Sequence, residues 1–442
     1  MNIVYFHTHD TGRYIEPYGY NVDTPNLMEL AREGTLFRQA FCAAPTCSPS
    51  RASLLTGRYP HNNGMLGLAH RGFKLDNYNQ HLASFLGSEG WETVLCGVQH
   101  VASGEKSAEK IGYQKQLVTS GEQQNAVETD RALASRAAEY IRHEADQPFF
   151  LSLGLLNTHR EFPDIDENIN PDYVQTPAPL PDDPDIREDM AAFYSSVQVV
   201  DHCLGLIQDA LRESGLEEET IFIFTTDHGI AFPRMKCNLY DSGIGVSLLL
   251  KYPDNPGQGA AVDALVSQID LFPTLCELTG LNRPDWLEGH SLLPLLEGSR
   301  EKIRDSLFAE VTYHASYEPM RCIRTERYKY IKYFGEHEGV VPANIDESPG
   351  KSLLMEHGLL EEKRDREQLF DLYFDPQEKN NLIDENHCQD IYQQLSGELE
   401  RWMVETDDPL LEGPVPLPEG AKINRISSVD PGSSDPDDYI YG

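Results

Sequence analysis

Four short apolar runs of this sequence end in polar side chains that can bind a metal ion or transfer a proton. The runs are Ile3–Phe6, Thr93–Cys96, Phe149–Leu156 and Ile221–Phe224. The residues that follow them are His9 and Asp10, His100, His159, and Asp227 with His228. One such histidine alone is usually structural, but the carboxyl ends of parallel strands meet at one edge of a sheet. If the runs are neighbouring strands, these side chains predict a metal-assisted hydrolytic site.

A cysteine and an arginine stand about one helical turn apart, at Cys47 and Arg51. Pro49 suits the first turn of a helix, and Gly57 predicts its end. A helix dipole stabilises a thiolate at its N-terminus. We therefore expect an activated Cys47 with Arg51 pointing back toward it as an anion-binding group. The alternative is a capped core helix without chemistry of its own.

Residues 47–58 resemble the signature of the type I sulfatases, C-x-P-S-R-x-x-x-L-T-G-R, at every fixed position. The N-terminal string NIVYFHTHD resembles the first strand of that family with its metal ligands, and TTDHG at 225–229 resembles the second ligand pair. The similarity extends to the sulfamidases (heparan N-sulfatases) within the family. The strings that carry it are Gly229–Pro233, Asn238–Tyr240 and Tyr317–Arg321.

The resemblance implies a nucleophile made from the motif cysteine. In this family a maturation enzyme oxidises that cysteine to formylglycine, an aldehyde. One oxygen of its hydrate attacks sulfur, and deprotonation of the other then expels sulfate. Cys47 would be this nucleophile, and Arg51 would hold the hydrate. His100 and His159 would contact the sulfate and transfer protons, and Lys236 would bind a sulfate oxygen.

The resemblance also implies a divalent metal, which is calcium in the family. Its ligands here would be Asp10, Asp227, His228 and His9. The family usually has an acidic residue where this chain has His9, and calcium prefers oxygen ligands, so two imidazoles favour manganese or zinc. A second departure is Val98, where the family usually carries a lysine that binds sulfate.

Net charge limits the partners of the chain. Its 442 residues include 36 basic and 72 acidic ones, a formal charge of -36. Such an excess repels nucleic acid, anionic membranes and long polyanions. We therefore expect a small or chain-terminal sulfated carbohydrate that enters a locally basic pocket. Further substrate-binding candidates are His70, Arg71, Tyr313, His314 and Arg321; for the first two, a solvated loop is an equal alternative.

The order of the segments that position these residues predicts an α/β fold. Apolar runs alternate with amphipathic patterns at Thr24–Gly34, 130–143 and 187–215, which predicts a large, mostly parallel sheet flanked by helices. The family resemblance implies an alkaline-phosphatase-like sandwich. Past residue 300, the charged alternation of Met320–Phe334 predicts a strand or hairpin, and Ile391–Thr406 predicts a last helix.

Three regions follow from these patterns. We expect a catalytic α/β domain over 1–305, a smaller C-terminal α+β subdomain with a short antiparallel sheet over 306–426, and a flexible tail over 427–442. Eight scattered cysteines without a CxxC pair predict buried free thiols. The sequence starts without a basic and apolar leader, and it has no run of about 20 apolar residues, so we expect a cytoplasmic protein without a membrane partner.

Other functions stay open at this stage. The same scaffold hosts phosphodiester and phosphonate monoester hydrolases, which is the main alternative to a sulfatase. A non-catalytic carbohydrate-binding relative is a third reading, but intact Cys47, Arg51, Asp10 and Asp227 argue against a decayed site. The resemblance implies the formylglycine-generating maturation enzyme as a partner. A homodimer is an open alternative to a single chain.

Overall fold

The computed structural model describes residues 1–118 and 125–442. Its centre is an eight-stranded sheet in the order β5-β4-β6-β1-β7-β8-β2-β9. The strands from β5 to β7 run parallel, whereas β8 is antiparallel to both of its neighbours. The sheet strands are β1 (Asn2–Thr8), β2 (Thr35–Phe37), β4 (Glu92–Gly97), β5 (Lys115–Leu117), β6 (Phe149–Gly154), β7 (Thr220–Thr226), β8 (Leu248–Lys251) and β9 (Ala261–Val262). The predicted mostly parallel sheet is confirmed.

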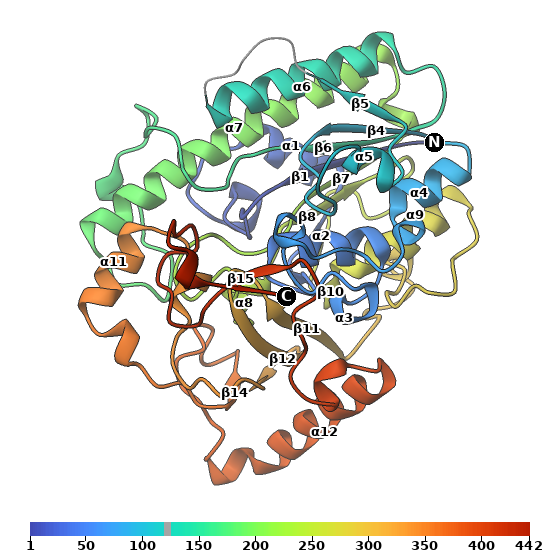
Figure 1. Ribbon diagram of the computed structural model, residues 1–442. Coiled ribbons are helices and arrows are strands. Elements are labelled where there is room, and N and C mark those ends of the chain that lie inside the picture. Colours follow the sequence, from blue (N-terminus) through green and yellow to red (C-terminus); the bar gives the residue numbers. More distant parts are fainter. Residues whose placement is uncertain (119–124) are drawn as a thin grey trace.

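Helices cover both faces of this sheet (Figure 1). On one face lie α1 (Pro25–Glu33), α6 (Ala126–His143) and α7 (Pro184–Ser214). On the other lie α2 (Cys47–Thr56), α4 (Leu82–Ser88) and α9 (Leu271–Thr279). Shorter helices are α3 (Pro60–Asn63), α5 (Ser107–Lys110), α8 (Asp241–Ile244) and α10 (Leu293–Leu296).

Strand β1 shows why the apolar runs read as fully buried strands. Alternate side chains of a strand point to opposite faces of its sheet. Ile3 and Tyr5 pack in the core with α2, α4 and α9, while Val4 and Phe6 pack in the core with α1, α6 and α7. Both faces are covered, so no position of the run needs a polar residue.

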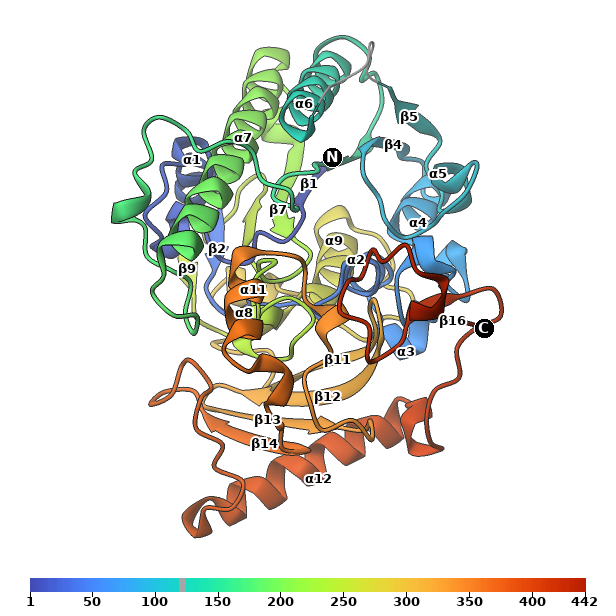
Figure 2. The same ribbon diagram turned by 60° about the vertical axis from the view of Figure 1, so that its left-hand side comes forward.

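A second, antiparallel sheet of four strands stands below the first (Figure 2). It consists of β11 (Ser306–Tyr313), β12 (Tyr317–Thr325), β13 (Tyr328–Tyr333) and β14 (Glu367–Asp371). Helix α12 (Gln389–Glu405) packs on β12 and β13, and α11 (Pro349–Glu356) lies against α7. The charged alternating segment therefore forms a hairpin in a small C-terminal sheet, as its pattern predicts.

The chain terminus is more ordered than its composition suggests. Strand β16 (Tyr439–Tyr441) pairs with β15 (Lys422–Asn424). The guanidinium of Arg71 donates to the side chain of Asn424 at 2.7 Å and to the carbonyl of Pro431 at 2.7 Å. Where we expected a flexible tail over 427–442, the structure has a hairpin and a loop held against the body of the molecule.

Two further sequence features have structural counterparts. All eight cysteines are free and buried, as predicted. Among the described helices, α7 alone is long and apolar enough to cross a membrane by length and composition, and 72% of its most apolar window is buried inside the fold. A core helix packed on both α6 and the sheet accounts for that apolar content.

A two-stranded sheet of β3 (Ala40–Phe41) and β10 (Val266–Ser267) completes the regular strands of the described residues.

Candidate active site

The four polar strand ends meet at one edge of the central sheet. β4, β6, β1 and β7 are consecutive neighbours in the sheet and run parallel, so their carboxyl ends lie side by side. The ring of His9 lies 5.0 Å from that of His100 and 5.6 Å from that of His159, between ring centroids. Asp10 and His100 adopt left-handed φ angles of 48° and 55°. Such angles are uncommon outside glycine, and they turn the chain sharply at the strand ends.

Two aspartates and two histidines form a buried cluster at this edge. Nδ1 of His9 lies 3.3 Å from Oδ2 of Asp227, and Nε2 of His228 lies 3.4 Å from Oδ1 of Asp10. The backbone N–H of Asp10 donates to Oδ1 of Asp227 at 2.9 Å. All four side chains are buried, so their charges interact in a region of low dielectric constant.

The cluster has the donor set that a divalent cation needs. Within the described residues, four of its buried atoms make no hydrogen bond: Nδ1 of His9, Oδ1 of Asp10, Oδ2 of Asp227 and Nε2 of His228. Oδ2 of Asp227 has ion-pair contacts with His9 and Arg51. Unsatisfied buried polar atoms are rare unless an ion or water completes them. Ligand atoms of His9, Asp10, Asp227 and Cys47 all lie within 4.8 Å of one another. Two carboxylates and two imidazoles fit a divalent metal.

Cys47 begins helix α2 and its sulfur reaches this cluster. The residue is 3% exposed. Burial raises the pKa of its thiol far above the usual range, although the charge of Lys236 acts in the opposite direction. Burial therefore opposes the thiolate that a helix N-terminus favours in the unmodified residue. An unmodified Cys47 is a neutral thiol and a weak nucleophile.

Arg51 lies one turn along α2 and is fixed at the end of β1. Its guanidinium lies 3.0 Å from Oδ2 of Asp227 and donates to the carbonyl of Thr8 at 2.7 Å. The ring of His7 contacts the same guanidinium. Asp227 stays ionised: burial raises its pKa, but the charges of His228 and Arg51 hold that pKa well below the usual range.

Lys236 brings a second cation to the site. Its Nζ atom lies 2.9 Å from Oδ2 of Asp10 and 2.9 Å from Oδ2 of Asp346. Burial lowers the pKa of this lysine, but the two carboxylates raise it well above its usual value. Lys236 therefore carries a positive charge beside the metal-binding cluster.

The mouth of the site is lined by imidazoles. The ring of His70 lies 6.0 Å from that of His100. Burial and the nearby Arg51 lower the pKa of His100 to about 3, so its imidazole is neutral at neutral pH. Nδ1 of His159 contacts the carbonyl of Arg160 at 2.5 Å, which fixes its ring. The backbone of Val98 pairs with Gly154, and its side chain brings no cation to this rim.

Three of the proposed substrate-binding residues have structural partners instead. Arg71 binds the C-terminal segment, as described above. The hydroxyl of Tyr313 donates to the carbonyl of Val415 at 2.6 Å. Arg321 is fully buried, with its Nε atom 2.6 Å from Asp408 and 3.0 Å from Glu310. The structure thus places these side chains in packing and ion-pair roles, while His314 lies close enough to Lys236 for that charge to lower its pKa, after the effect of burial.

Two residues that support the site, Asp130 and Ser50, were not predicted from the sequence motifs. Asp130 of α6 accepts hydrogen bonds from the backbone of Leu156 and Asn157, both at 2.8 Å, and so shapes the loop before His159. Ser50 donates to the carbonyl of Asp227 at 2.5 Å. Ser50 belongs to the motif and could have been noticed, but Asp130 carries no spacing pattern that links it to the site.

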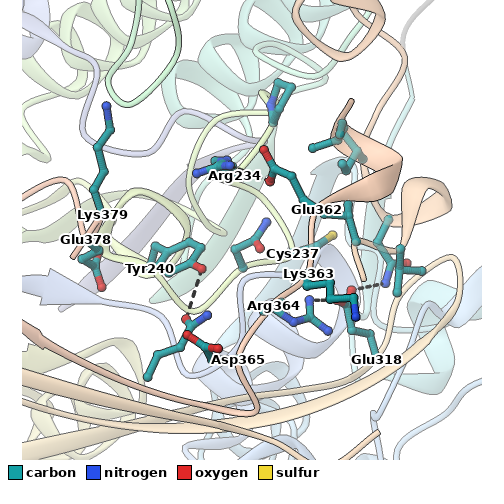
Figure 3. Close-up of a pocket in the computed structure, with 18 of the residues that line it drawn as sticks. Arg234, Cys237, Tyr240, Glu318, Glu362, Lys363, Arg364, Asp365, Glu378 and Lys379 are labelled. Carbon is teal, nitrogen blue, oxygen red and sulfur yellow. Dashed lines mark hydrogen bonds and ion pairs between the residues drawn. The ribbon is translucent and has the colours of Figure 1, made fainter. Parts of the chain in front are cut away.

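A polar cavity of about 420 Å³ lies next to the site (Figure 3). Its wall includes Cys237, which follows Lys236, and Ile345, which precedes Asp346. Figure 3 shows ion pairs across this wall, among them Arg364 with Glu318. Lys236 and Asp346 themselves are not among the residues that line this cavity.

Comparison with known proteins gives two matching family profiles. The family described as Sulfatase matches residues 1–281, and the one described as N-sulphoglucosamine sulphohydrolase, C-terminal, matches residues 228–351. N-sulphoglucosamine sulphohydrolase of Homo sapiens is 29% identical and aligns over 92% of this chain and 89% of its own. An ulvan-active sulfatase of Formosa agariphila is 28% identical, with 94% and 82% covered.

Solved structures share the fold over nearly the whole chain. A protein solved with its substrate D-glucosamine-2-N,6-O-disulfate has a TM-score of 0.71 at 18% identity and covers 92% of this chain and 98% of that one. The phosphonate monoester hydrolase of Agrobacterium radiobacter has a TM-score of 0.71 at 21% identity, with 92% and 96% covered. At these identities the similarity concerns the fold alone.

Proposed function

Because the chain belongs to the sulfatase family, we propose that it hydrolyses a sulfate ester or sulfamate on a small or chain-terminal sulfated sugar. The observation that carries this proposal is the position of Cys47. It begins α2 within the motif Cys47-Ser48-Pro49-Ser50-Arg51, and its sulfur lies within 4.8 Å of ligand atoms of His9, Asp10 and Asp227.

An amino sugar with an N-sulfate is the first substrate class that we propose. The second family profile and the human relative both carry the name of an N-sulphoglucosamine sulphohydrolase. The chain covers 89% of that relative. The formal charge of -36 favours a small molecule over a long polyanion, because a long chain of sulfates would be repelled by most of the surface.

The roles proposed for the residues come from the family resemblance, and the positions of the side chains support them. Conversion of Cys47 to formylglycine by a maturation enzyme supplies a hydrated aldehyde as the nucleophile. Arg51, fixed by Thr8 and Asp227, neutralises charge on that group. Lys236 binds a sulfate oxygen. Of the two rim imidazoles, His159 donates a proton to the leaving nitrogen or oxygen as its bond to sulfur breaks, and the neutral imidazole of His100 contacts the sulfate group.

His9, Asp10, Asp227 and His228 would hold a divalent metal. When bound, this ion supplies polarisation of the sulfate group and orientation of the nucleophile. We propose manganese or zinc as alternatives to the calcium that the family resemblance implies, because two of the four side chains are imidazoles. The residues themselves hold the like charges of Arg51 and Lys236 apart, since each cation pairs with a different aspartate.

A second candidate function is hydrolysis of a phosphodiester or phosphonate monoester. A metal site with two imidazole ligands favours this second function, because manganese and zinc suit the metal sites of phosphoryl ester hydrolases. The test uses the metal-loaded protein after co-expression with a maturation enzyme. Sulfate release from N-sulfoglucosamine and from glucosamine 6-sulfate is compared with hydrolysis of bis-p-nitrophenyl phosphate. A kcat/KM for the phosphodiester above that for both sulfated sugars would replace the sulfatase proposal.

A further inference from the structure

Asp346 reaches the candidate active site from the C-terminal part of the chain. It lies between the short helix Pro342–Asn344 and α11, whereas the metal-binding cluster and Cys47 come from the first 228 residues. Its Oδ2 atom is buried, lies 2.9 Å from Nζ of Lys236, and has no further hydrogen-bond partner in the part of the chain that the structure describes. The side chain as a whole is 22% exposed, so it stands at the border between the site and solvent.

The backbone of Lys236 is held by its loop, and its charged end is held by two carboxylates. The backbone N–H of Lys236 donates to Ile230 at 3.2 Å, and its carbonyl accepts from Asn238 at 3.0 Å. Among the described residues, the ion pairs of its Nζ atom are those with Asp10 and Asp346. A lysine has a flexible four-carbon stem, so a carboxylate on each side is what fixes the ammonium in one place.

We propose that Asp346 is a positioning residue that holds the ammonium of Lys236 toward the sulfate group of the substrate. This inference rests on the proposed sulfatase function. Without Asp346, the ammonium has Asp10 as its one remaining carboxylate partner in the described chain, and Asp10 also belongs to the proposed metal site. The ammonium then moves toward Asp10 and away from the sulfate.

A simpler electrostatic role for Asp346 predicts the opposite result. A carboxylate near an anionic substrate repels it, so removal of that charge alone would tighten sulfate binding. A positioning role predicts weaker sulfate binding on removal, and it predicts that an isosteric amide preserves much of the effect. The amide oxygen of asparagine still accepts a hydrogen bond from Nζ, whereas alanine offers no acceptor.

The experiment measures KM and kcat for a sulfated sugar, and the inhibition constant of inorganic sulfate, in Asp346→Ala and Asp346→Asn. Glu347→Gln is the matched control, because Glu347 is the neighbouring acid, is 59% exposed, and pairs with Lys351 instead. We expect Asp346→Ala to raise both KM and the inhibition constant about tenfold, the loss of one hydrogen bond to a charged group. We expect kcat to change less than about threefold, and both Asp346→Asn and the control to stay within about threefold of wild type.

Several results would overturn the inference. Unchanged or tighter sulfate binding in a folded Asp346→Ala protein would show that the carboxylate only repels anions. A loss confined to N-sulfated substrates, with the inhibition constant of sulfate unchanged, would mean that Asp346 contacts the leaving nitrogen directly. If wild type itself neither releases sulfate nor is inhibited by sulfate, the proposed function fails and this inference falls with it. Thermal melting of each variant identifies any that does not fold.

Discussion

Replacing Arg321 with leucine separates a structural role for this arginine from a role in substrate binding. The guanidinium is fully buried, lies 2.6 Å from Asp408 and 3.0 Å from Glu310, and donates to the carbonyl of Val311 at 2.8 Å. Removing one partner of a buried ion pair leaves uncompensated charge and costs about 3–5 kcal/mol of unfolding free energy. Here Asp408 loses its cation, while Glu310 keeps the imidazole of His61 at 2.7 Å, so we expect a cost within that range.

The expected change in melting temperature follows from chain length. An unfolding entropy of about 2.1 cal/mol/K per residue gives roughly 0.9 kcal/mol/K for the whole chain. A loss of about 3–5 kcal/mol of unfolding free energy therefore corresponds to a decrease in Tm of about 3–5 °C. The assay is thermal unfolding of wild type, Arg321→Leu and the control Arg300→Leu, whose arginine is exposed. KM for the sulfated sugar is measured on the same samples.

Acidity provides a further check on this ion pair. Burial raises the pKa of Asp408, but Arg321 holds it below its usual value. A depressed folded-state pKa stabilises the fold above the unfolded-state pKa of about 3.9, and the contribution is lost as pH falls through the folded-state value. The difference in Tm between wild type and Arg321→Leu should therefore shrink toward low pH. An unchanged Tm at neutral pH together with a raised KM would refute the structural assignment.

Four other predictions follow from the site and its surroundings. Cys47→Ala should abolish sulfate release while Tm stays within about 2 °C, because only one buried sulfur atom is removed; wild-type rates in that variant would contradict the nucleophile. His9→Asp should shift the metal that gives most activity toward calcium, since an oxygen replaces a nitrogen ligand; an unchanged metal profile would mean that His9 does not bind the ion. Chelation should lower Tm and abolish activity, with both restored by a divalent metal, because an ion bound only by the folded state stabilises it; a Tm insensitive to chelator and to metal would argue against the site. Burial lowers the pKa of His61, but Glu310, 2.7 Å away, raises it above the usual value. This pair should therefore stabilise the fold fully below about pH 6.5 and lose that effect as pH rises through the folded-state pKa; a His61→Gln protein with the same dependence of Tm on pH as wild type would disprove the coupling.

The central sheet could be predicted because its strands carry a strong pattern. Ile3–Phe6 and Ile221–Phe224 are apolar throughout, and both faces of β1 and β7 are indeed covered by helices. Once these strands are parallel neighbours, the convergence of His9, His100 and His159 follows from topology alone. The strand-end residues could therefore be identified from the sequence, and the sheet order β4-β6-β1-β7 brings them together.

The contribution of the C-terminal part could not be predicted in the same way. Asp346 lies in an irregular segment whose position depends on how the second sheet packs against the first, and no local pattern reports that packing. Arg321 lies in a strand of alternating charged residues, a pattern typical of an exposed strand. In the structure its guanidinium is buried and forms ion pairs with Asp408 and Glu310. The tail has the composition of a flexible segment, yet pairing of β15 with β16 satisfies its backbone.

The thiol of Cys47 illustrates a limit of reasoning from helix geometry. A position at the N-terminus of α2 favours a thiolate, but the sequence does not show that Cys47 is 3% exposed and lies close to Asp10 and Asp227. Burial and the two carboxylates both oppose ionisation. A neutral thiol in this place is consistent with a nucleophile that must be made by oxidation of the side chain.

Mass spectrometry of the peptide around Cys47 tests the central proposal most directly. The protein is produced together with a maturation enzyme and separated into fractions whose sulfate release is measured. We expect the active fractions to contain a peptide about 18 Da lighter than the thiol form, the mass change for conversion of cysteine to formylglycine. Sulfate release should rise in proportion to this peptide. Full activity in protein whose Cys47 is entirely an unmodified thiol would contradict the account.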